Sequence, residues 1–325
     1  MVGRRVVLAG AAIGNGNRGV EALGRSVVDA VQRDSPGATL SILDDGWGVR
    51  HDPGPRHPDI GVEMVGVRQS RRWYRPESWA QIRLAQATLP RLNPVATRLG
   101  AADLVLDLSA GDSFTDLYGP ARLNAITLPK RAALRAGRPL VLLPQTYGPF
   151  TSPRSRHLAG ELIRAATIAY ARDPWSYQQL LDLAGPAADQ SRLRDGVDVA
   201  FALEPRRPDD VTAQQVERSP GDVTVGVNVS GLLLDGSAHA RFGLAGNYLD
   251  TMTALVAALT DRGAQVVLVP HVHVGDGRGE SDINAIDQLR ARLPPSQRAS
   301  TSVLPTSLDA SQVKWCISQL DWFVG

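Results

Sequence analysis

The sequence predicts an α/β protein built from two Rossmann-like domains. Short apolar runs typical of buried parallel strands alternate with segments of helical periodicity. This alternation continues on both sides of a charged, proline-containing stretch, and 325 residues are enough for two domains of ordinary size. We therefore expect an N-terminal domain over residues 1–203, a linker over 204–222 and a C-terminal domain over 223–325.

The composition is that of a soluble globular protein, with 43% hydrophobic and 21% charged residues. A net charge of +2 is too small to indicate a nucleic-acid partner. The single cysteine, Cys316, excludes an internal disulfide and a multi-cysteine metal site, and it favours a reducing compartment. No apolar run reaches membrane-spanning length. We expect a cytoplasmic protein without a transmembrane segment.

The chain begins with a strand at residues 5–9, followed by a glycine-rich loop and a helix. Gly14, Gly16 and Gly19 match the G-x-G-x-x-G pattern, and Asp44 ends the next strand, which resembles a dinucleotide-binding fingerprint. Several residues separate the strand from Gly14, whereas that fingerprint starts directly at the strand end. A nicotinamide-dependent oxidoreductase is therefore the weaker alternative.

Two acidic residues follow the strand predicted at residues 103–108. Asp112 and Asp116 share one face if a helix begins at Ser113, and both then become candidates for a site. Asp112 could equally be the N-cap of that helix. Upstream, the basic and aromatic residues 68–75 favour a solvated surface loop, although they could also contact an anionic or lipid-linked acceptor.

Residues 138–150 form a nearly apolar strand that ends in a proline-stiffened turn. Ligands of open α/β sheets bind beyond the carboxyl ends of the strands, so Gln145 and Tyr147 are candidates for ligand contact. The alternative is a plain loop. The next strand ends in Arg172 and Asp173, which could hold an anion or form a local salt bridge. Residues 197–201 are expected to be the last strand of this domain.

The second domain is expected to repeat the α/β pattern. His271 follows a strand and is the histidine best placed for proton transfer, although it could simply hydrogen-bond the loop together with His273. A metal pair with Asp276 lacks a third firm ligand, so no metal is expected. The elements predicted here are strands at 223–229, 265–269, 301–304 and 322–325, and helices at 248–262, 282–293 and 309–320.

Seven motifs, taken in order, resemble the polysaccharide pyruvyl transferase family. They are Gly14–Gly19 with Glu21 and Ala22, Asp107–Asp116, Pro144–Phe150, Ala171–Ser176, Asp198–Phe201, Val227–Ser230 and Val269–His271. The resemblance implies two Rossmann-like domains facing a cleft, as in GT-B enzymes. It also implies transfer of the enolpyruvyl unit of phosphoenolpyruvate to a sugar of an envelope or exopolysaccharide, which gives a pyruvyl ketal.

The sequence departs from the family pattern at two places. Ser109-Ala110-Gly111 stands where many members have consecutive glycines, so the backbone is less permissive there. The family continues after a Phe-Val-Gly strand into an Arg-x-His segment, whereas this sequence ends at Gly325. We therefore expect an incomplete second domain and a truncated chain.

The resemblance also assigns roles to residues. His271, Asp112 and Asp116 are expected to be catalytic, the histidine in proton transfer and the carboxylates in orienting or deprotonating acceptor hydroxyls. Arg172 is the first choice for anion binding, and Arg18 with the surrounding backbone N–H groups is the second. The full set of expected substrate-binding residues is Asn15, Gly16, Asn17, Arg18, Gly19, Gln145, Tyr147, Arg172, Asp173 and Asn228.

The expected partners are phosphoenolpyruvate as donor and a sugar or polysaccharide acceptor, which could be lipid-linked. No cofactor, metal or nucleic acid is expected, and peripheral membrane contact is compatible with the sequence. Two alternatives stay open. One is a GT-B glycosyltransferase that uses a nucleotide sugar, and the other is a non-catalytic fragment or binding protein.

Overall fold

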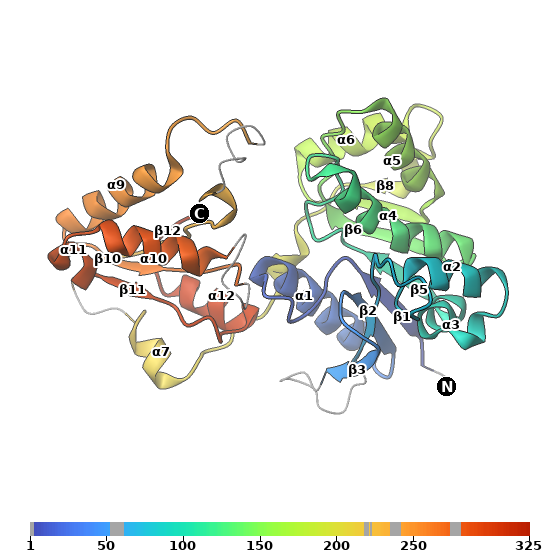
Figure 1. Cartoon of the computed structure of the whole chain (residues 1–325), viewed down its shortest axis with the longest axis horizontal. Helices are drawn as coiled ribbons and strands as arrows, with labels where there is room; N and C mark the ends of the chain where they lie inside the picture. The colour runs from blue at the N-terminus through green and yellow to red at the C-terminus, as the bar shows by residue number, and fades with distance from the viewer. Residues whose placement is uncertain (1–2, 53–61, 218–220, 222, 235–241, 274–280) are drawn as a thin grey trace. The chain divides into compact units, whose positions relative to one another are not determined.

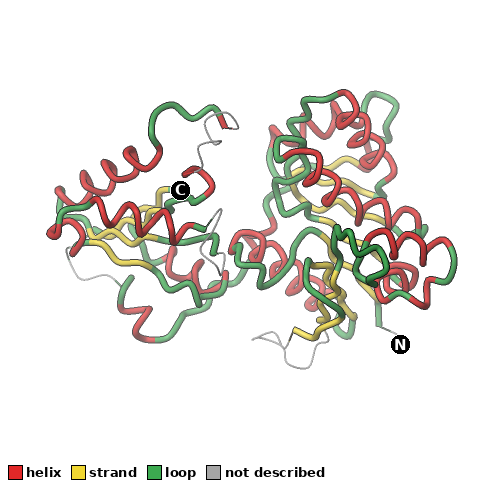
Figure 2. Tube along the Cα trace, viewed as in Figure 1, coloured by secondary structure: helices red, strands yellow, loops and turns green. Residues whose placement is uncertain are grey.

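A computed structural model describes residues 3–52, 62–217, 221, 223–234, 242–273 and 281–325. The chain divides into two compact units (Figure 1). Unit 1 comprises residues 1–13 and 23–203, and unit 2 comprises residues 14–22 and 204–325. Each unit contains a sheet of parallel strands with helices, so the α/β fold class predicted from the sequence is confirmed. Figure 2 shows the strands and helices of each unit.

Unit 1 is built on an eight-stranded sheet in the order β3-β4-β2-β1-β5-β6-β7-β8. All neighbouring strands are parallel except β3 and β4, so β1, β5, β6 and β7 end at the same edge. The strands are β1 (Arg5–Ala9), β2 (Thr39–Asp44), β3 (Val49–Asp52), β4 (Val62–Gly66), β5 (Leu104–Asp107), β6 (Leu140–Gln145), β7 (Ile168–Ala171) and β8 (Leu193–Arg194).

Both faces of this sheet bury apolar side chains, because successive residues of a strand point to opposite faces. Val7 packs into a core with the helices from α2 to α6. Val6 packs into a second core with α1. The helices of this part of the chain are α1 (Arg18–Asp34), α2 (Trp79–Ala87), α3 (Pro94–Ala101), α4 (Gly119–Arg135), α5 (Pro153–Ala165) and α6 (Pro174–Ala184), with short 3-10 turns η1 (Pro90–Leu92), η2 (Gln190–Arg192) and η3 (Val199–Ala202).

The prediction of a strand at residues 197–201 is wrong. The segment contains the 3-10 turn η3, and the last strand of the sheet is β8. The Asp198 side chain accepts a hydrogen bond of 2.9 Å from the backbone N–H of Ala200 and thereby caps the turn. Val197 and Phe201 are 68% and 79% exposed, and only Val199 and Ala200 of this segment pack against the core, each of them partly buried.

Unit 2 contains a four-stranded parallel sheet in the order β11-β10-β9-β12. Its strands are β9 (Thr224–Val227), β10 (Gln265–Leu268), β11 (Thr301–Val303) and β12 (Trp322–Val324), and its helices are α7 (Asp210–Gln214), α9 (Tyr248–Asp261), α10 (Asp282–Arg292), α11 (Pro295–Ala299) and α12 (Ala310–Ser318), with the 3-10 turn η4 (Leu232–Leu234). None of the helices in the described residues of either unit has the length and hydropathy needed to cross a membrane.

The division of the chain differs from the predicted domains in two ways. Residues 14–22, which the sequence places in the N-terminal domain, group with unit 2. The segment predicted as a linker contains helix α7, and Val216 within it is 1% exposed and packs against Val313 and Cys316. Residues 204–216 are therefore part of a folded unit, because a free linker would not bury an apolar side chain in a core.

Candidate functional site

The turn after β5 has an unusual backbone. Ser109, Ala110 and Gly111 have φ angles of 48°, 56° and 84°, so three successive residues lie in the left-handed region. Only glycine enters this region without a steric cost, and the two other residues must be held there by their surroundings. The N–H of Ala110 donates to Gly10 O at 2.6 Å, and the N–H of Gly111 donates to Leu108 O at 2.7 Å.

The two candidate carboxylates of this segment do not share a helix face, which corrects the prediction. No helix begins at Ser113, because α4 starts only at Gly119. Asp112 is exposed, and its carboxylate accepts a hydrogen bond of 2.9 Å from the Tyr118 hydroxyl. It remains available to a ligand at the carboxyl edge of the sheet.

Asp116 has a mainly structural set of partners. Its carboxylate accepts hydrogen bonds from the backbone N–H groups of Thr151 and Ser152, at 2.9 and 3.1 Å. Burial of the group opposes ionisation, but these hydrogen bonds together outweigh burial and lower the pKa of Asp116 below its ordinary value. Asp116 therefore stays ionised and fixes the start of α5, and it is a weaker candidate for proton transfer than Asp112.

Gln145 and Tyr147 are both fully buried, so neither side chain lies on the surface of unit 1, and no described residue hydrogen-bonds the amide group of Gln145. The Tyr147 hydroxyl donates to the backbone carbonyl of Tyr170 at 3.0 Å, and its ring packs against Phe114. Burial raises the pKa of this hydroxyl far above its ordinary value, so Tyr147 stays protonated. The turn folds back against β7 and turns these two side chains inward, while Thr146 between them is only partly buried.

Arg172 lies at the carboxyl end of β7 with its guanidinium partly exposed. Its Nη1 donates to Asp198 Oδ2 at 3.0 Å, and its Nε lies 3.8 Å from Asp173 Oδ2. A Cβ atom added to Gly111 would stand 3.3 Å from Nη1, so the guanidinium lies beside the left-handed turn. Asp173 is itself the N-cap of α6, and its carboxylate accepts a hydrogen bond of 2.7 Å from the backbone N–H of Ser176. Asp198 is therefore the main residue that orients Arg172.

The glycine-rich loop of residues 14–19, whose backbone N–H groups are predicted to bind an anion together with Arg18, pairs with the segment after β10. The N–H of His273 donates to Gly16 O at 2.8 Å, and the N–H of Arg18 donates to His271 O at 2.8 Å. Asn17 forms an isolated antiparallel bridge with Val272. A Cβ atom at Gly16 would stand 2.1 Å from His273 O. Gly16 thus permits close approach of two backbones.

The donors at the start of α1 are largely occupied as well. The Asn17 side chain accepts from the N–H of Val20 at 3.1 Å, and the Asn15 side chain accepts from the N–H of Asn17 at 2.9 Å. The Arg18 guanidinium donates to Glu21 and to Thr306 O, both at 2.7 Å. These two bonds hold Arg18 within unit 2 and occupy two of its five N–H donors, so its role in anion binding stays a prediction. Gly19 lies in the first turn of α1, where an added Cβ atom would stand 3.3 Å from Asn17 Oδ1.

Asp282, which the sequence does not single out, organises the carboxyl edge of the sheet in unit 2. It is 2% exposed and accepts hydrogen bonds from the backbone N–H groups of Gly231, His271 and Val272, at 2.9, 2.8 and 2.9 Å. The Asn228 amide also donates to it at 3.2 Å. In the sequence Asp282 only looks like an acidic residue in the first turn of a helix, so no local pattern predicts this role.

The backbone of His271 is fixed by hydrogen bonds to Asp282 and Arg18, and its side chain is partly buried. Burial lowers the pKa of its imidazole, and the nearby Asp282 carboxylate opposes this only partly. The ring lies 5.8 Å from the ring of Phe323. His271 is therefore neutral at pH 7 and can accept a proton. The described residues contain no group of three or more potential metal ligands, and Asp276 of the alternative metal pair lies outside the described residues.

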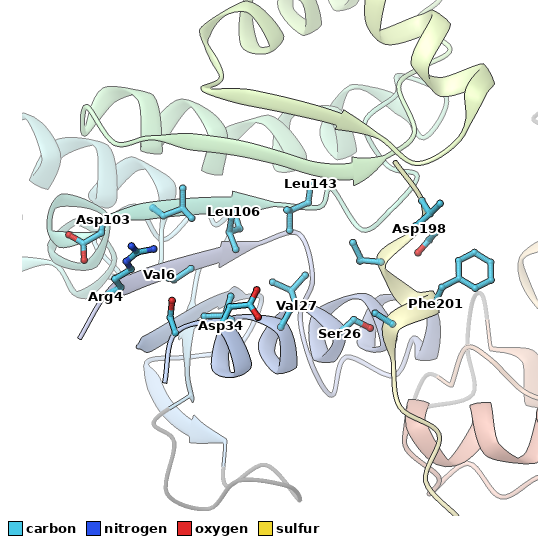
Figure 3. Close-up of a pocket in the computed structure, with 17 residues that line it drawn as sticks. Arg4, Val6, Ser26, Val27, Asp34, Asp103, Leu106, Leu143, Asp198 and Phe201 are labelled. Carbon is cyan, nitrogen blue, oxygen red and sulfur yellow. The ribbon is translucent and has the colours of Figure 1, made fainter. Parts of the chain in front are cut away.

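Two cavities that are lined by described residues of unit 1 differ in character. One, of about 570 Å³, has a mixed lining whose polar residues include Asp116, Asn124, Arg131, Ser152 and Arg154. The other, of about 640 Å³, lies over the sheet face between α1 and residues 197–202 (Figure 3). Its lining is mainly apolar, with Val6, Val27, Leu106 and Leu143, and does not suit a phosphate.

Each unit places polar residues beyond the carboxyl ends of a Rossmann-like parallel sheet, which is an architecture of the GT-B type. The chain belongs to the polysaccharide pyruvyl transferase family, whose sequence profile matches residues 17–325. It is a transferase by family, which confirms the resemblance seen in the sequence. No curated protein sequence matches the chain.

Similar solved structures agree on the fold. An α,α-trehalose 6-phosphate synthase from Burkholderia multivorans is 13% identical, with a TM-score of 0.51 over 99% of this chain and 77% of the other. A putative UDP-N-acetylglucosamine 2-epimerase from Listeria monocytogenes is also 13% identical, with a TM-score of 0.54 over 99% of this chain and 74% of the other. At such identities the likeness concerns the fold alone.

Proposed function

We propose that this protein transfers the pyruvyl group of phosphoenolpyruvate to a sugar of a polysaccharide and forms a cyclic ketal. Membership of the polysaccharide pyruvyl transferase family over residues 17–325 is the observation that carries this proposal. The proposed reaction involves no change of oxidation state. The two substrates therefore supply all reacting atoms, in keeping with the expectation that no cofactor is needed.

The proposed chemistry balances as an addition followed by a displacement. A proton adds to the methylene carbon of phosphoenolpyruvate, and C2 acquires oxocarbenium character that a sugar hydroxyl attacks. The attacking hydroxyl loses its proton, so this step consumes one proton and releases one. A second hydroxyl of the sugar then attacks C2, the bond to the phosphate oxygen breaks, and the phosphate leaves with the proton that this hydroxyl loses.

Arg172 is the residue we assign to the anionic donor. Arginine recognises carboxylate and phosphate groups through two parallel N–H···O bonds. Asp198 occupies Nη1, while Nη2 has no hydrogen-bond partner among the described residues. The guanidinium is thus oriented from one side and free on another, as an anion-binding arginine should be.

Asp112 is the residue of unit 1 that we assign to the acceptor hydroxyl, and His271 is the residue of unit 2 that we assign to proton transfer. A neutral imidazole is the form that accepts a proton, and burial keeps His271 in this form at pH 7. Asp112 is an exposed carboxylate that can accept a hydrogen bond from a sugar hydroxyl. The polar cavity beside Asp116 offers hydroxyl, amide and guanidinium groups, which supports binding of a polyhydroxylated ligand in unit 1.

The test is release of inorganic phosphate from phosphoenolpyruvate in the presence of a panel of sugars, free and lipid-linked. We expect phosphate release that requires both the donor and an acceptor. Release of nucleoside diphosphate from a nucleotide sugar, without any consumption of phosphoenolpyruvate, would instead indicate a glycosyltransferase. Absence of both reactions, with a folded protein, would favour a binding protein.

A further inference from the structure

A fully buried ion pair lies directly beneath the left-handed turn at Ser109. Lys130 of α4 and Asp107 at the end of β5 are 0% and 1% exposed, and Lys130 Nζ lies 2.6 Å from Asp107 Oδ1. The ammonium donates its other two hydrogen bonds to Ser109 Oγ at 2.7 Å and to Ile126 O at 3.0 Å. All three donors of the only buried lysine among the described residues are therefore satisfied.

The ion pair forms hydrogen bonds with the backbone nitrogen and the hydroxyl of Ser109. Asp107 Oδ1 accepts from the backbone N–H of Ser109 at 3.1 Å and from its hydroxyl at 3.0 Å. Ser109 thus bonds to both partners of the ion pair and cannot rotate to a relaxed conformation without breaking these bonds. This accounts for a non-glycine residue with a φ of 48° at this position.

The Ser109–Gly111 turn also contacts the candidate anion-binding residue, Arg172. Gly111, its last residue, lies against Arg172, and its carbonyl accepts from the N–H and the hydroxyl of Thr146 at 2.9 and 3.2 Å. The turn therefore joins the ends of β5 and β6 and packs against the guanidinium at the end of β7. Any change in the conformation of Ser109 and Ala110 is transmitted to the position of Gly111 beside Arg172.

Stability alone gives a poor reason for this arrangement. Replacement of a buried ion pair by apolar residues of similar volume is often neutral or stabilising, because both charges must be desolvated. Burial does lower the pKa of Lys130, with Asp107 opposing the change. A turn that must hold two L-residues in the left-handed region, next to a functional arginine, is by contrast a clear use for fixed charges.

We propose that Lys130 is a positioning residue, which acts with Asp107 to hold the Ser109–Gly111 turn in its left-handed conformation and so sets the place of Arg172. This proposal rests on the proposed function for its kinetic readout. Consecutive glycines would adopt this left-handed conformation without support, whereas Ser109 and Ala110 need the hydrogen bonds of Lys130 and Asp107 to stay in it.

The test compares two variants. In the first, apolar residues replace the buried ion pair, and in the second, glycines also replace Ser109 and Ala110 in the turn. Asp107→Leu/Lys130→Met removes both charges together, and we expect a thermal midpoint close to that of the wild type. We expect KM for phosphoenolpyruvate to rise and kcat/KM to fall about ten- to hundredfold, because small misplacements of a binding group have effects of this size. Adding Ser109→Gly and Ala110→Gly is expected to restore most of the loss, because glycine adopts the turn without support.

A control and a second variant keep the test decisive. Asp250→Leu/Arg292→Met removes an exposed ion pair of unit 2 and is expected to leave kcat/KM unchanged. Ser109→Ala keeps the buried pair but removes the hydroxyl that links it to the turn, and it is expected to raise KM even if the double variant does not fold. Wild-type kinetics in both Asp107→Leu/Lys130→Met and Ser109→Ala would overturn the proposal, and so would a loss that the two glycines fail to restore.

Amide hydrogen exchange separates this proposal from the proposed function. If the wild type releases no phosphate from any donor and acceptor, the proposed function fails, but the network can still be tested. We then expect faster exchange of the Ala110 and Gly111 amides in Asp107→Leu/Lys130→Met than in the wild type. Unchanged protection of these amides would overturn the positioning role.

Discussion

At the scale of single residues, the buried carboxylate of Asp282 has the largest structural consequence. Three backbone N–H groups and the Asn228 amide converge on it, and the described residues provide no cation as its partner. We expect Asp282→Asn to lower the free energy of unfolding by roughly 3 kcal/mol, because an amide cannot accept all four bonds and loses the charge. Asp287→Asn, on the exposed side of the same helix, is the control and should change it by less than about 0.5 kcal/mol. Equal effects in chemical denaturation would contradict this role.

The burial of His271 leads to a pH dependence of stability. Its pKa in the folded protein lies below the ordinary value of 6.5, so the unfolded chain binds more protons near and below pH 6.5. We therefore expect this histidine to reduce the free energy of unfolding as the pH falls below 6.5. Denaturation of wild type and His271→Gln across this range measures the effect. An equally steep loss of stability in both proteins would contradict it.

The roles of single residues were harder to predict than the positions of the strands that they follow. Asp112 and Arg172 lie beyond strand ends as the sequence suggested, and both keep groups that a ligand can reach. Tyr147 also follows a strand, but its side chain points into the core. There its ring packs against Phe114 and its hydroxyl donates to the carbonyl of Tyr170. Whether a polar side chain after a strand points inward depends on the next strand, which no local pattern describes.

At the scale of elements, the glycine-rich loop shows a long-range pairing that sequence could not reveal. Its pattern resembles a phosphate loop, yet its partner is the backbone at residues 271–273. By contrast, helix α12 was predicted well from the helical spacing of its apolar residues, and the structure shows that a capping box between Asp309 and Gln312 fixes its start. Local signals of this kind fix where a helix begins, whereas contacts between distant segments leave no trace in periodicity.

Two glycines of this loop provide a matched test of the pairing. Both have positive φ, 73° at Gly14 and 82° at Gly16, so alanine costs about 1 kcal/mol of backbone strain at either position. Only at Gly16 does an added Cβ meet another backbone, at His273 O. We expect Gly16→Ala to lower the free energy of unfolding by about 1–3 kcal/mol more than Gly14→Ala. Equal losses in chemical denaturation would contradict the pairing.

At the scale of the whole molecule, the sequence predicted the α/β class from its alternating strands and helices, but it placed residues 14–22 in the N-terminal domain and read residues 204–222 as a linker. The stretch before β9 looked like a linker because charges and prolines dominate it. Its apolar residues are few, and one of them, Val216, completes the core beneath α12. Thr212, Ala213 and Val216 are the buried residues around α7, and so few of them are too weak a pattern to stand out in a charged segment.

Two valines of this stretch test whether it is folded. Val216 is 1% exposed and Val211, in α7, is 72% exposed. We expect Val216→Ala to lower the free energy of unfolding by about 1.5–3 kcal/mol, because it removes buried apolar surface. Val211→Ala should have an effect within about 0.5 kcal/mol. If residues 204–222 were a free linker, the two substitutions would have the same small effect.

Transfer of labelled carbon from phosphoenolpyruvate to a sugar tests the central claim most directly. The protein is incubated with carbon-labelled phosphoenolpyruvate and the acceptor panel, and the sugar product is analysed by mass spectrometry and NMR. We expect the label in a ketal carbon of the sugar, with phosphate released in equal amount, and a reduction of about a hundredfold or more in Arg172→Gln because the donor loses a charged partner. Phosphate release without label in the sugar, or full transfer by Arg172→Gln, would contradict the account.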